Sequence, residues 1–349
     1  MANAALRPEL RRILIVSDAW VPQVNGVVRT LATVADQLRS MGRWVEVIGP
    51  DRFRSIPCPT YPEIRLALAP QRHMAQMIEA FAPDAMHIAT EGPLGLAARA
   101  FARRGKLAFT TSFHTRFPEY IRARTGLPVG PIYAWMRRFH GAAVATMVAT
   151  PSLRAELAAH GFRSLAPWSR GVDLELFRPD PRQDWDLPRP IFAYVGRVAV
   201  EKNIEAFLNL DLPGSKVVVG GGPQLEALRR RYTRVRFTGP RHGAALARAY
   251  AGADVMIFPS LTDTFGLVIL ESLACGTPVA AFPVTGPIDV LGEAPGNVGA
   301  VHSDLRCAAL TALTGDRTAC RDYAERFSWR ASAELFLKNL TPIRRGEPP

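Results

Sequence analysis

The sequence predicts an α/β protein with two doubly wound domains. Its 349 residues suggest two domains, since a domain usually takes roughly 150 residues. Short apolar segments alternate with helical stretches along the chain, which is typical of parallel strands covered by helices on both faces of a sheet. The alternation occurs in two separate series, and each series accounts for one doubly wound sheet.

Ten segments are predicted as strands because they are short, continuous apolar runs. The first series covers residues 13–17, 44–49, 85–88, 107–112 and 145–149. The second series covers residues 191–195, 215–219, 235–238, 255–258 and 278–281. Ligands of doubly wound sheets bind at the carboxyl ends of the strands, so functional residues are expected in the loops that leave these strands.

The domain boundary is predicted near residues 165–173, before a proline-rich stretch at 177–190. Residues 328–340 carry apolar side chains at helical spacing, among them Trp329, Phe336 and Leu340, and are predicted as an amphipathic helix. We therefore expect one domain at residues 1–168, a second at 169–327 and a final helical segment at 328–349.

Composition and patterning favour a cytoplasmic protein. No stretch of 18 apolar residues occurs, and a spanning helix needs about 20. Residues 1–12 lack the apolar core of a secretion signal. The four cysteines form no CxxC pair and have no zinc-ligand spacing.

The net charge of +12 arises mostly from arginine, which attracts nucleic acid, anionic lipid or phosphorylated ligands. A nucleic-acid-binding protein is expected to cluster its basic residues among aromatic ones. Here the arginines are scattered along the chain, so no nucleic-acid partner is expected.

Glycines mark three of the loops that leave predicted strands. Asn25 and Gly26 precede a helix, where glycine lets a ligand approach the backbone and the helix amides favour an anion. A plain turn and helix cap explains this pair at least as well. Gly196 ends a strand, and Gly221 and Gly222 belong to a run of three glycines after another, although such a run is only weakly specific.

Two cations follow Gly196. Arg197 lies on the loop, and Lys202 lies near the start of the next predicted helix. The helix dipole disfavours cations at a helix N-terminus unless an anion lies between them. A diphosphate is therefore a candidate ligand, and a solvated basic loop is the alternative.

The most specific segment follows the strand at 255–258. Asp263 lies on the loop, Phe265 and Gly266 lead into a helix that starts near Leu267, and Glu271 lies within that mainly apolar helix. Free amides at the helix start favour an anion. A buried carboxylate is costly without hydrogen bonds, and ribose hydroxyls would supply them to Glu271.

His114 leaves a strand of the first series. A lone histidine is more often structural than catalytic, but its place at a strand's carboxyl end favours a functional role.

These segments together resemble retaining glycosyltransferases of the GT-B fold, in family 4. The shared signature is an acidic residue, then Phe-Gly, then a glutamate eight positions after the first, here Asp263, Phe265-Gly266 and Glu271. Segments 90–95 and 112–118 resemble a narrower subgroup. It includes bacterial GDP-mannose-dependent mannosyltransferases and glucuronosyl- and sulfoquinovosyl-diacylglycerol synthases.

The resemblance implies two Rossmann-like domains facing across a cleft. The first would be the acceptor side, the second would bind the nucleotide sugar, and the final helix would cross back to the first. The implied roles are as follows: Arg197 and Lys202 hold the diphosphate, Glu271 binds the ribose, Asp263 and His114 contact the donor sugar, and Gly26 lets its loop close over the phosphates. Many relatives have glutamate in place of Asp263 and two glycines in place of Asn25-Gly26.

The implied reaction moves a hexose from a UDP- or GDP-linked donor to an acceptor hydroxyl with retention of configuration. Arg197, Lys202 and the amides near Gly266 would stabilise the charge that grows on the leaving diphosphate. The one Asp-x-Asp motif, Asp184-Trp185-Asp186, lies in the proline-rich stretch and is interpreted as solvated loop. No cofactor and no essential metal are expected.

The acceptor suggested by the subgroup is a membrane lipid such as diacylglycerol. Segments 121–124 and 132–139 mix arginine with aromatic and aliphatic residues, and such a surface can rest on the inner face of an anionic membrane. An ordinary helix packed by its aromatic side is an equal alternative. A polysaccharide or soluble acceptor is the second possibility, and a sugar-nucleotide epimerase or a silent sugar-nucleotide binder is a more distant one.

Overall fold

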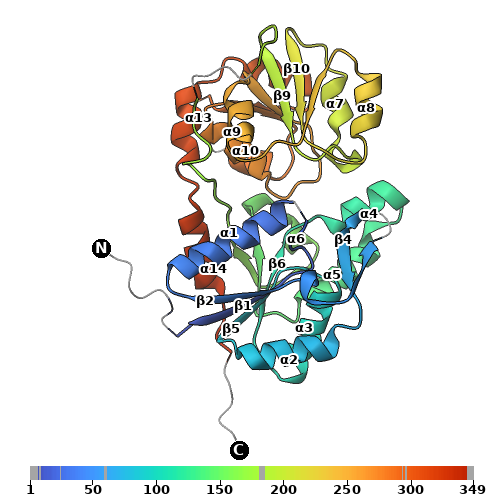
Figure 1. Ribbon diagram of the computed structural model, residues 1–349, viewed down its shortest axis with the longest axis vertical. Helices are drawn as coiled ribbons and strands as arrows, with labels where there is room; N and C mark the ends of the chain where they lie inside the picture. Colours follow the sequence, from blue (N-terminus) through green and yellow to red (C-terminus); the bar gives the residue numbers. More distant parts are fainter. Residues whose placement is uncertain are drawn as a thin grey trace, which may run out of the picture. The chain divides into compact units, whose positions relative to one another are not determined.

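The computed structural model describes residues 7, 9–23, 25–58, 61–180, 185–292, 294 and 297–343. They form two compact units, which Figure 1 shows as ribbons. Unit 1 comprises Met1–Arg122, Gly126–Ser169 and Trp329–Pro349, and unit 2 comprises Ala123–Thr125 and Arg170–Ser328. Each unit contains a six-stranded sheet.

The sheet of unit 1 is parallel, with strand order β2-β1-β5-β6-β7-β8. Its strands are β1 (Arg12–Val16), β2 (Trp44–Ile48), β5 (Ala85–Ile88), β6 (Thr110–Phe113), β7 (Ala145–Val148) and β8 (Leu165–Pro167). Every residue of β5 and β6 is buried. Burial on both faces fits the lack of alternation between apolar and polar residues in these strands, although β6 itself is mostly hydroxyl residues, Thr110-Thr111-Ser112-Phe113.

Helices cover both faces of this sheet (Figure 1). They are α1 (Gly26–Ser40), α2 (Gln71–Phe81), α3 (Pro93–Arg104), α4 (Phe117–Thr125), α5 (Val129–His140), α6 (Pro151–Ala159) and α14 (Trp329–Asn339), with a 3-10 turn η1 (Pro50–Arg52). The last helix, α14, packs against α1. Its fully buried Phe336 contacts the rings of His87 and Trp168, with centroids 4.8 and 4.9 Å away.

The sheet of unit 2 is also parallel, with strand order β11-β10-β9-β12-β13-β14. Its strands are β9 (Ile191–Val195), β10 (Ser215–Val219), β11 (Arg236–Gly239), β12 (Val255–Phe258), β13 (Val279–Ala281) and β14 (Gly299–Val301). Its helices are η2 (Val200–Lys202), α7 (Ile204–Leu208), α8 (Leu225–Arg231), α9 (Gly243–Ala251), α10 (Leu267–Ala274), α11 (Pro287–Leu291), α12 (Leu305–Ala312) and α13 (Arg317–Ala324).

All ten predicted strands are present, and the predicted α/β class of two doubly wound sheets is confirmed. The largest difference in a boundary is at β6, which begins at Thr110 rather than residue 107. Four further strands were not predicted. Two are the short edge strands β8 and β14, and two form an antiparallel hairpin, β3 (Ser55–Cys58) with β4 (Tyr61–Ala67).

Proline and glycine hide these four strands in the sequence. The hairpin carries Pro57 and Pro62, β8 ends at Pro167 and β14 begins at Gly299. Proline cannot donate to a sheet ladder and is confined to edges, and glycine weakens a strand. Pairing with neighbours therefore outweighs local propensity at these positions.

Each sheet has a switch point, where the direction of strand addition reverses. In unit 1 the chain passes from β1 to β2 and then returns to the other side of β1 with β5. In unit 2 it passes from β9 through β10 to β11 and then returns beside β9 with β12. Ligands of doubly wound sheets bind at such points. In unit 2 the switch point lies between β9 and β12.

Among the described residues, no helix is both long and apolar enough to cross a bilayer.

Candidate active site

Two loops meet at the switch point of unit 2. Asn203, which follows η2, donates a hydrogen bond through Nδ2 to the carbonyl oxygen of Pro259 at 3.1 Å. Thr262 donates through Oγ1 to the carbonyl oxygen of Glu201 at 3.2 Å. These bonds tie the loop that follows β9 to the loop that follows β12. They bring together the two segments that the sequence singled out for a diphosphate and a donor sugar.

Lys202 and Asp263 form an ion pair between these loops, from Nζ to Oδ1. The side chains are 22% and 17% exposed, so the pair is largely shielded from solvent. The sequence argument required an anion near Lys202, and the structure supplies one from the chain itself. An ammonium group carries three N–H donors and can hold a carboxylate and a phosphate oxygen together.

The start of α10 lies on the β12 loop. Gly266 is its cap residue, has a left-handed φ of 85° and provides no side-chain cap. A Cβ there would lie 3.0 Å from the Phe258 ring, so both backbone and packing require glycine. Phe265 is buried before it, and Leu267 begins the helix. The amides of this first turn are oriented to bind an anion.

The corresponding position in unit 1 is occupied by the protein itself. Asp18 follows β1 and accepts hydrogen bonds from the amides of Leu94 and Gly95 in the first turn of α3, at 2.8 and 3.2 Å. Thr90 donates to the same carboxylate at 2.9 Å. Burial raises the pKa of the Asp18 carboxyl, and the hydrogen bonds oppose that shift. The helix start at this switch point is therefore already capped by a carboxylate.

Glu271 lies on α10 and is 3% exposed. Its Oε2 accepts a hydrogen bond from the hydroxyl of Tyr250 on α9 at 2.9 Å. The protein therefore supplies one of the hydrogen bonds that this buried carboxylate needs, and the predicted bonds from ribose hydroxyls would add to it. Sequence reasoning missed Tyr250, which lies 21 residues earlier on another helix and belongs to no local motif.

The glycine run after β10 packs closely against the loop that follows β9. A Cβ on Gly220 would lie 1.8 Å from the carbonyl oxygen of Gly196, and one on Gly222 would lie 2.4 Å from that of Val198. The neighbouring loop by itself therefore requires glycine at these two positions. Only Gly221, where a Cβ would have no neighbour closer than 3.7 Å, keeps the room that the sequence argument proposed for a ligand.

Three buried oxygens at the carboxyl ends of β12 and β13 have no hydrogen-bond partner among the described residues. They are Oγ of Ser260, Oδ2 of Asp263 and Oγ1 of Thr285. Thr285 precedes Gly286, whose Cβ would lie 2.8 Å from the carbonyl oxygen of Phe265, so its loop packs on the β12 loop. Buried polar atoms usually have partners, and hydroxyl groups of a sugar are suited to these three.

The remaining predicted site residues, Asn25, Gly26 and His114, belong to unit 1. Asn25 caps α1, accepting bonds at Oδ1 from the amides of Val27 and Val28 at 3.0 Å each. Its side chain therefore serves the helix cap that was the alternative interpretation, and Gly26 is the first helical residue. His114 follows β6, and its ring packs edge-on against Trp168 at 5.5 Å.

The Asp-x-Asp motif is not a uniformly solvated loop. Asp184 lies outside the described residues and Asp186 is exposed. Trp185, however, is buried and donates to the carbonyl oxygen of Ala249 at 3.2 Å, because its large ring packs beside α9. Within the described ranges, no group of three or more His, Cys, Asp or Glu side chains is placed to hold a metal ion.

A cavity of about 340 Å³ lies at the opposite, amino-terminal edge of the unit 2 sheet. Its lining includes Pro190, Asp254 and Pro278, which directly precede β9, β12 and β13. It is therefore separate from the candidate site at the carboxyl ends of the strands.

Comparison with known proteins agrees with this geometry. Residues 24–176 match the Glycosyltransferase Family 4 model, and residues 189–304 match the Glycosyl transferases group 1 model. The sulfoquinovosyl transferase SQD2 of Arabidopsis thaliana is 31% identical, over 92% of this chain and 72% of that protein. A GDP-mannose-dependent alpha-mannosyltransferase of Mycolicibacterium smegmatis is 32% identical, over 87% of this chain and 88% of that protein.

Solved structures share the fold. Sucrose-phosphate synthase from Thermosynechococcus elongatus superposes with a TM-score of 0.72 at 20% identity, over 93% of this chain and 96% of that one. HepE of Anabaena, solved with UDP and glucose, superposes with a TM-score of 0.66 at 15% identity, over 93% and 98%.

The two Rossmann-like units and the site at the second switch point define a glycosyltransferase of the GT-B architecture. Within that class, the chain belongs to glycosyltransferase family 4, in the group 1 glycosyltransferases, as its matched models and relatives establish. The resemblance seen in the sequence is thereby confirmed. The epimerase alternative is set aside.

The glycine run provides a first test. We expect Gly220→Ala to lower the free energy of unfolding by about 2–4 kcal/mol, because its Cβ would overlap the Gly196 backbone at a positive φ. Gly221→Ala, the matched control, should change it by less than about 0.5 kcal/mol. Urea unfolding measures both. Equal stability of Gly220→Ala and wild type would contradict the assigned packing role.

Proposed function

We propose that the enzyme is a retaining hexosyltransferase that uses a UDP- or GDP-linked sugar and glycosylates an acceptor hydroxyl. The observation that carries the proposal is the Lys202–Asp263 pair beside the start of α10, where the cap residue Gly266 contributes no side-chain hydrogen bond. A cation, a carboxylate and oriented amides at one switch point are suited to a ligand with a diphosphate and a sugar.

Unit 2 is the proposed donor-binding unit. Arg197, Lys202 and the amides near Gly266 bind the diphosphate, and Glu271 binds the ribose hydroxyls. The contrast between the units supports this choice: the α3 start in unit 1 is capped by Asp18, whereas the cap residue of α10, Gly266, contributes no side-chain hydrogen bond. A phosphate at α3 would meet a carboxylate of like charge.

The proposed chemistry depends on charge stabilisation. As the bond from the anomeric carbon to the phosphate oxygen breaks, negative charge grows on the diphosphate. Lys202, Arg197 and the α10 amides stabilise that charge without needing to reorganise. The acceptor hydroxyl attacks from the leaving-group side and passes its proton to the departing phosphate oxygen as its own oxygen bonds to the anomeric carbon, so the configuration is retained.

Asp263 and His114 are proposed to contact the donor sugar, and Ser260 and Thr285 extend the set of sugar contacts. Asp263 is one methylene shorter than the glutamate of many relatives, but Lys202 holds it in place through the ion pair. Its second carboxylate oxygen, together with the two hydroxyls, lies at the ends of neighbouring strands.

For the acceptor, we favour a membrane lipid such as diacylglycerol. The α5 helix buries Tyr133, Met136 and Phe139 but leaves Trp135 41% exposed. Leu127, in the preceding connection, is 54% exposed. Exposed arginines lie on the same helix and on the one before it, among them Arg138 on α5 and Arg122 on α4. Aromatic and aliphatic groups beside arginines are typical of surfaces that rest on anionic lipid.

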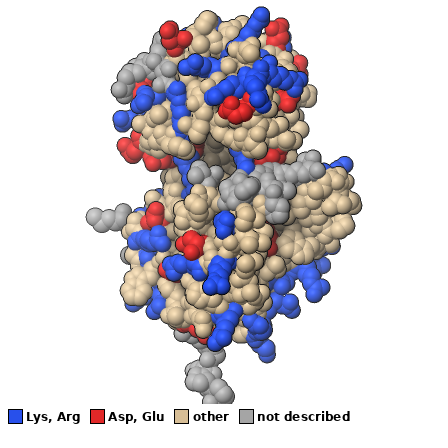
Figure 2. Space-filling model, turned by 45° about the vertical axis from the view of Figure 1, so that its right-hand side comes forward, with Lys and Arg blue, Asp and Glu red and all other residues tan. Residues whose placement is uncertain are grey.

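A hexosyltransferase with a polysaccharide or soluble acceptor is the second candidate. The similarity to GDP-mannose-dependent alpha-mannosyltransferases supports mannose as its sugar. Binding of nucleic acid has less support, because Figure 2 shows lysine and arginine side chains in several separate groups, interspersed with acidic ones, on the face it presents.

Donor screening tests the proposal. Purified protein with diacylglycerol and UDP-glucose, UDP-glucuronate, UDP-sulfoquinovose or GDP-mannose should give a glycosylated lipid of α configuration with one donor, detected by mass and NMR. Lys202→Ala should lower kcat by about 10²- to 10³-fold, as expected for loss of a group that stabilises transition-state charge. Lys338→Ala, an exposed lysine on α14, is the control.

Two outcomes would count against the proposal. Hydrolysis or epimerisation of the donor, with no transfer to any acceptor, would exclude a transferase. Full activity of Lys202→Ala would exclude the proposed role of the ion pair.

The proposed mechanism needs no metal ion. We expect the transfer rate to stay within about twofold of its initial value after treatment with excess EDTA, because cations of the chain stabilise the leaving group. Initial rates before and after chelation measure this. Complete loss of activity that Mg²⁺ or Mn²⁺ restores would refute the expectation.

Membrane association is tested by sedimentation with vesicles. The enzyme should sediment with phosphatidylglycerol vesicles and much less with phosphatidylcholine vesicles, since each arginine near an anionic surface contributes about 1 kcal/mol. Trp135→Ala combined with Arg138→Glu should reduce binding. Trp44→Ala, which removes a 68% exposed tryptophan elsewhere on unit 1, is the matched control. Equal binding to both vesicle types would argue for a soluble acceptor.

A further inference from the structure

We propose that Tyr250 is a positioning residue that orients the Glu271 carboxylate toward the ribose of the nucleotide. This inference rests on the proposed function, because it deepens the role of Glu271 in donor binding. It assigns to a residue of α9 part of the recognition of a ribonucleotide, which the α10 signature alone does not account for.

The first support is the contact itself. The Tyr250 hydroxyl donates to Oε2 of Glu271 at 2.9 Å, with Tyr250 fully buried and Glu271 3% exposed. The last torsion of a glutamate side chain is broad, so a carboxylate needs a partner to fix its plane. A bond to an ionised acceptor is about twice as strong as one between neutral groups. It therefore defines the directions in which the remaining lone pairs of Glu271 point.

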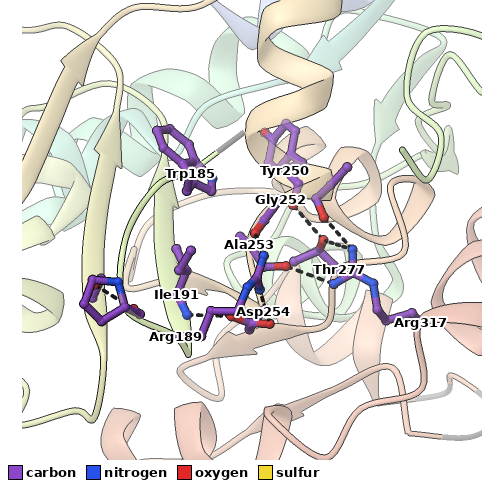
Figure 3. A network of polar contacts seen from close by, with 12 residues as sticks. Trp185, Arg189, Ile191, Tyr250, Gly252, Ala253, Asp254, Thr277 and Arg317 are labelled. Carbon is purple, nitrogen blue, oxygen red and sulfur yellow. Dashed lines mark hydrogen bonds and ion pairs between the residues drawn. The ribbon is translucent and has the colours of Figure 1, made fainter. Parts of the chain in front are cut away.

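The second support is that Tyr250 is itself held firmly. Its carbonyl oxygen accepts a hydrogen bond from Oγ1 of Thr277 at 2.7 Å. Arg317 donates to the carbonyl oxygens of Ala251 and Ala253, at 2.7 and 2.9 Å. Figure 3 shows Thr277 and Arg317 at the end of the helix that carries Tyr250. A cation at the C-terminal end of a helix is stabilising, and α9 is thereby fixed at the turn that carries the tyrosine.

Packing completes the arrangement. The Tyr250 ring meets the fully buried ring of Phe177 edge-on at 5.9 Å. On the neighbouring turn, Sγ of Cys275 donates to the carbonyl oxygen of Ala247 at 3.6 Å, which ties α10 to α9. The tyrosine hydroxyl therefore lies at a fixed distance from α10, as a positioning role requires.

The inference predicts that loss of the Tyr250 hydroxyl lowers the affinity for some nucleotides and not for others. If the hydroxyl orients Glu271 for ribose, its removal weakens only those ligands that present ribose hydroxyls. A merely structural role would weaken all nucleotides alike or lower stability alone. The comparison of a ribonucleotide with its 2′,3′-dideoxy analogue separates these effects, because both carry the same base and diphosphate.

The experiment is isothermal titration of the full-length protein with UDP and GDP and with their 2′,3′-dideoxy analogues, using the base that binds more tightly. Tyr250→Phe should raise the Kd of the ribonucleotide about tenfold, as loss of a hydrogen bond to a charged group implies. The Kd of the dideoxy analogue should change by less than about twofold. In a Glu271→Ala background, Tyr250→Phe should have no further effect on either ligand.

The matched control is Tyr323→Phe, which removes another buried hydroxyl of unit 2, bonded to the carbonyl oxygen of Val290 at 2.7 Å. A thermal unfolding transition measured for each variant checks that the variant is folded under the conditions of the titration. Equal weakening of ribonucleotide and dideoxynucleotide by Tyr250→Phe, or no weakening of either, would overturn the inference and leave the proposed function intact. If the wild type binds neither UDP nor GDP, the proposed function fails and the inference with it.

Discussion

The ion pair between Lys202 and Asp263 joins the two strands at which the sheet of unit 2 reverses its direction of growth. The loops after β9 and β12 carry most of the chemistry-bearing residues of this unit. Hydrogen bonds from the side chains of Asn203 and Thr262 to backbone carbonyl oxygens keep those loops adjacent. Opposite charges that are mostly shielded from water interact more strongly than they would on the surface. The positions of the cation, the acidic side chain and the α10 start thus depend on this ion pair together with the two hydrogen bonds.

The two units share one topology but differ at the helix that starts beside the switch point. At the β1–β5 switch point, Asp18 completes the first turn of α3, so the helix dipole is neutralised from within. At the β9–β12 switch point, the glycine at the start of α10 contributes no side chain. The same fold, built twice in one chain, therefore caps one of these helix starts with a carboxylate and places a glycine at the other. The carboxylate of unit 1 comes from the neighbouring strand, since Asp18 follows β1 and reaches the start of α3.

The sequence predicts the sheets well because parallel buried strands are continuous apolar runs, and it predicts the signature around Gly266 because its residues are local. It does not reveal the partner of Glu271, since Tyr250 is brought there only by packing of α9 on α10. The glycine run was assigned to a ligand because sequence shows no neighbouring backbone. In the structure, Gly220 and Gly222 face the carbonyl oxygens of the β9 loop. The short edge strands are set by pairing rather than by their own residues.

The close packing of the glycine run against the β9 loop also makes these turns rigid. The amide of Gly196 bonds to Val219, and the amide of Val198 bonds to the carbonyl oxygen of Gly221, while the missing side chains let the two backbones touch. The turns that follow β9 and β10 therefore form one rigid unit. Arg197 lies between the two residues, Gly196 and Val198, whose amides join these turns. The backbone of Arg197 is thereby restrained by hydrogen bonds at both of its neighbours, Gly196 and Val198.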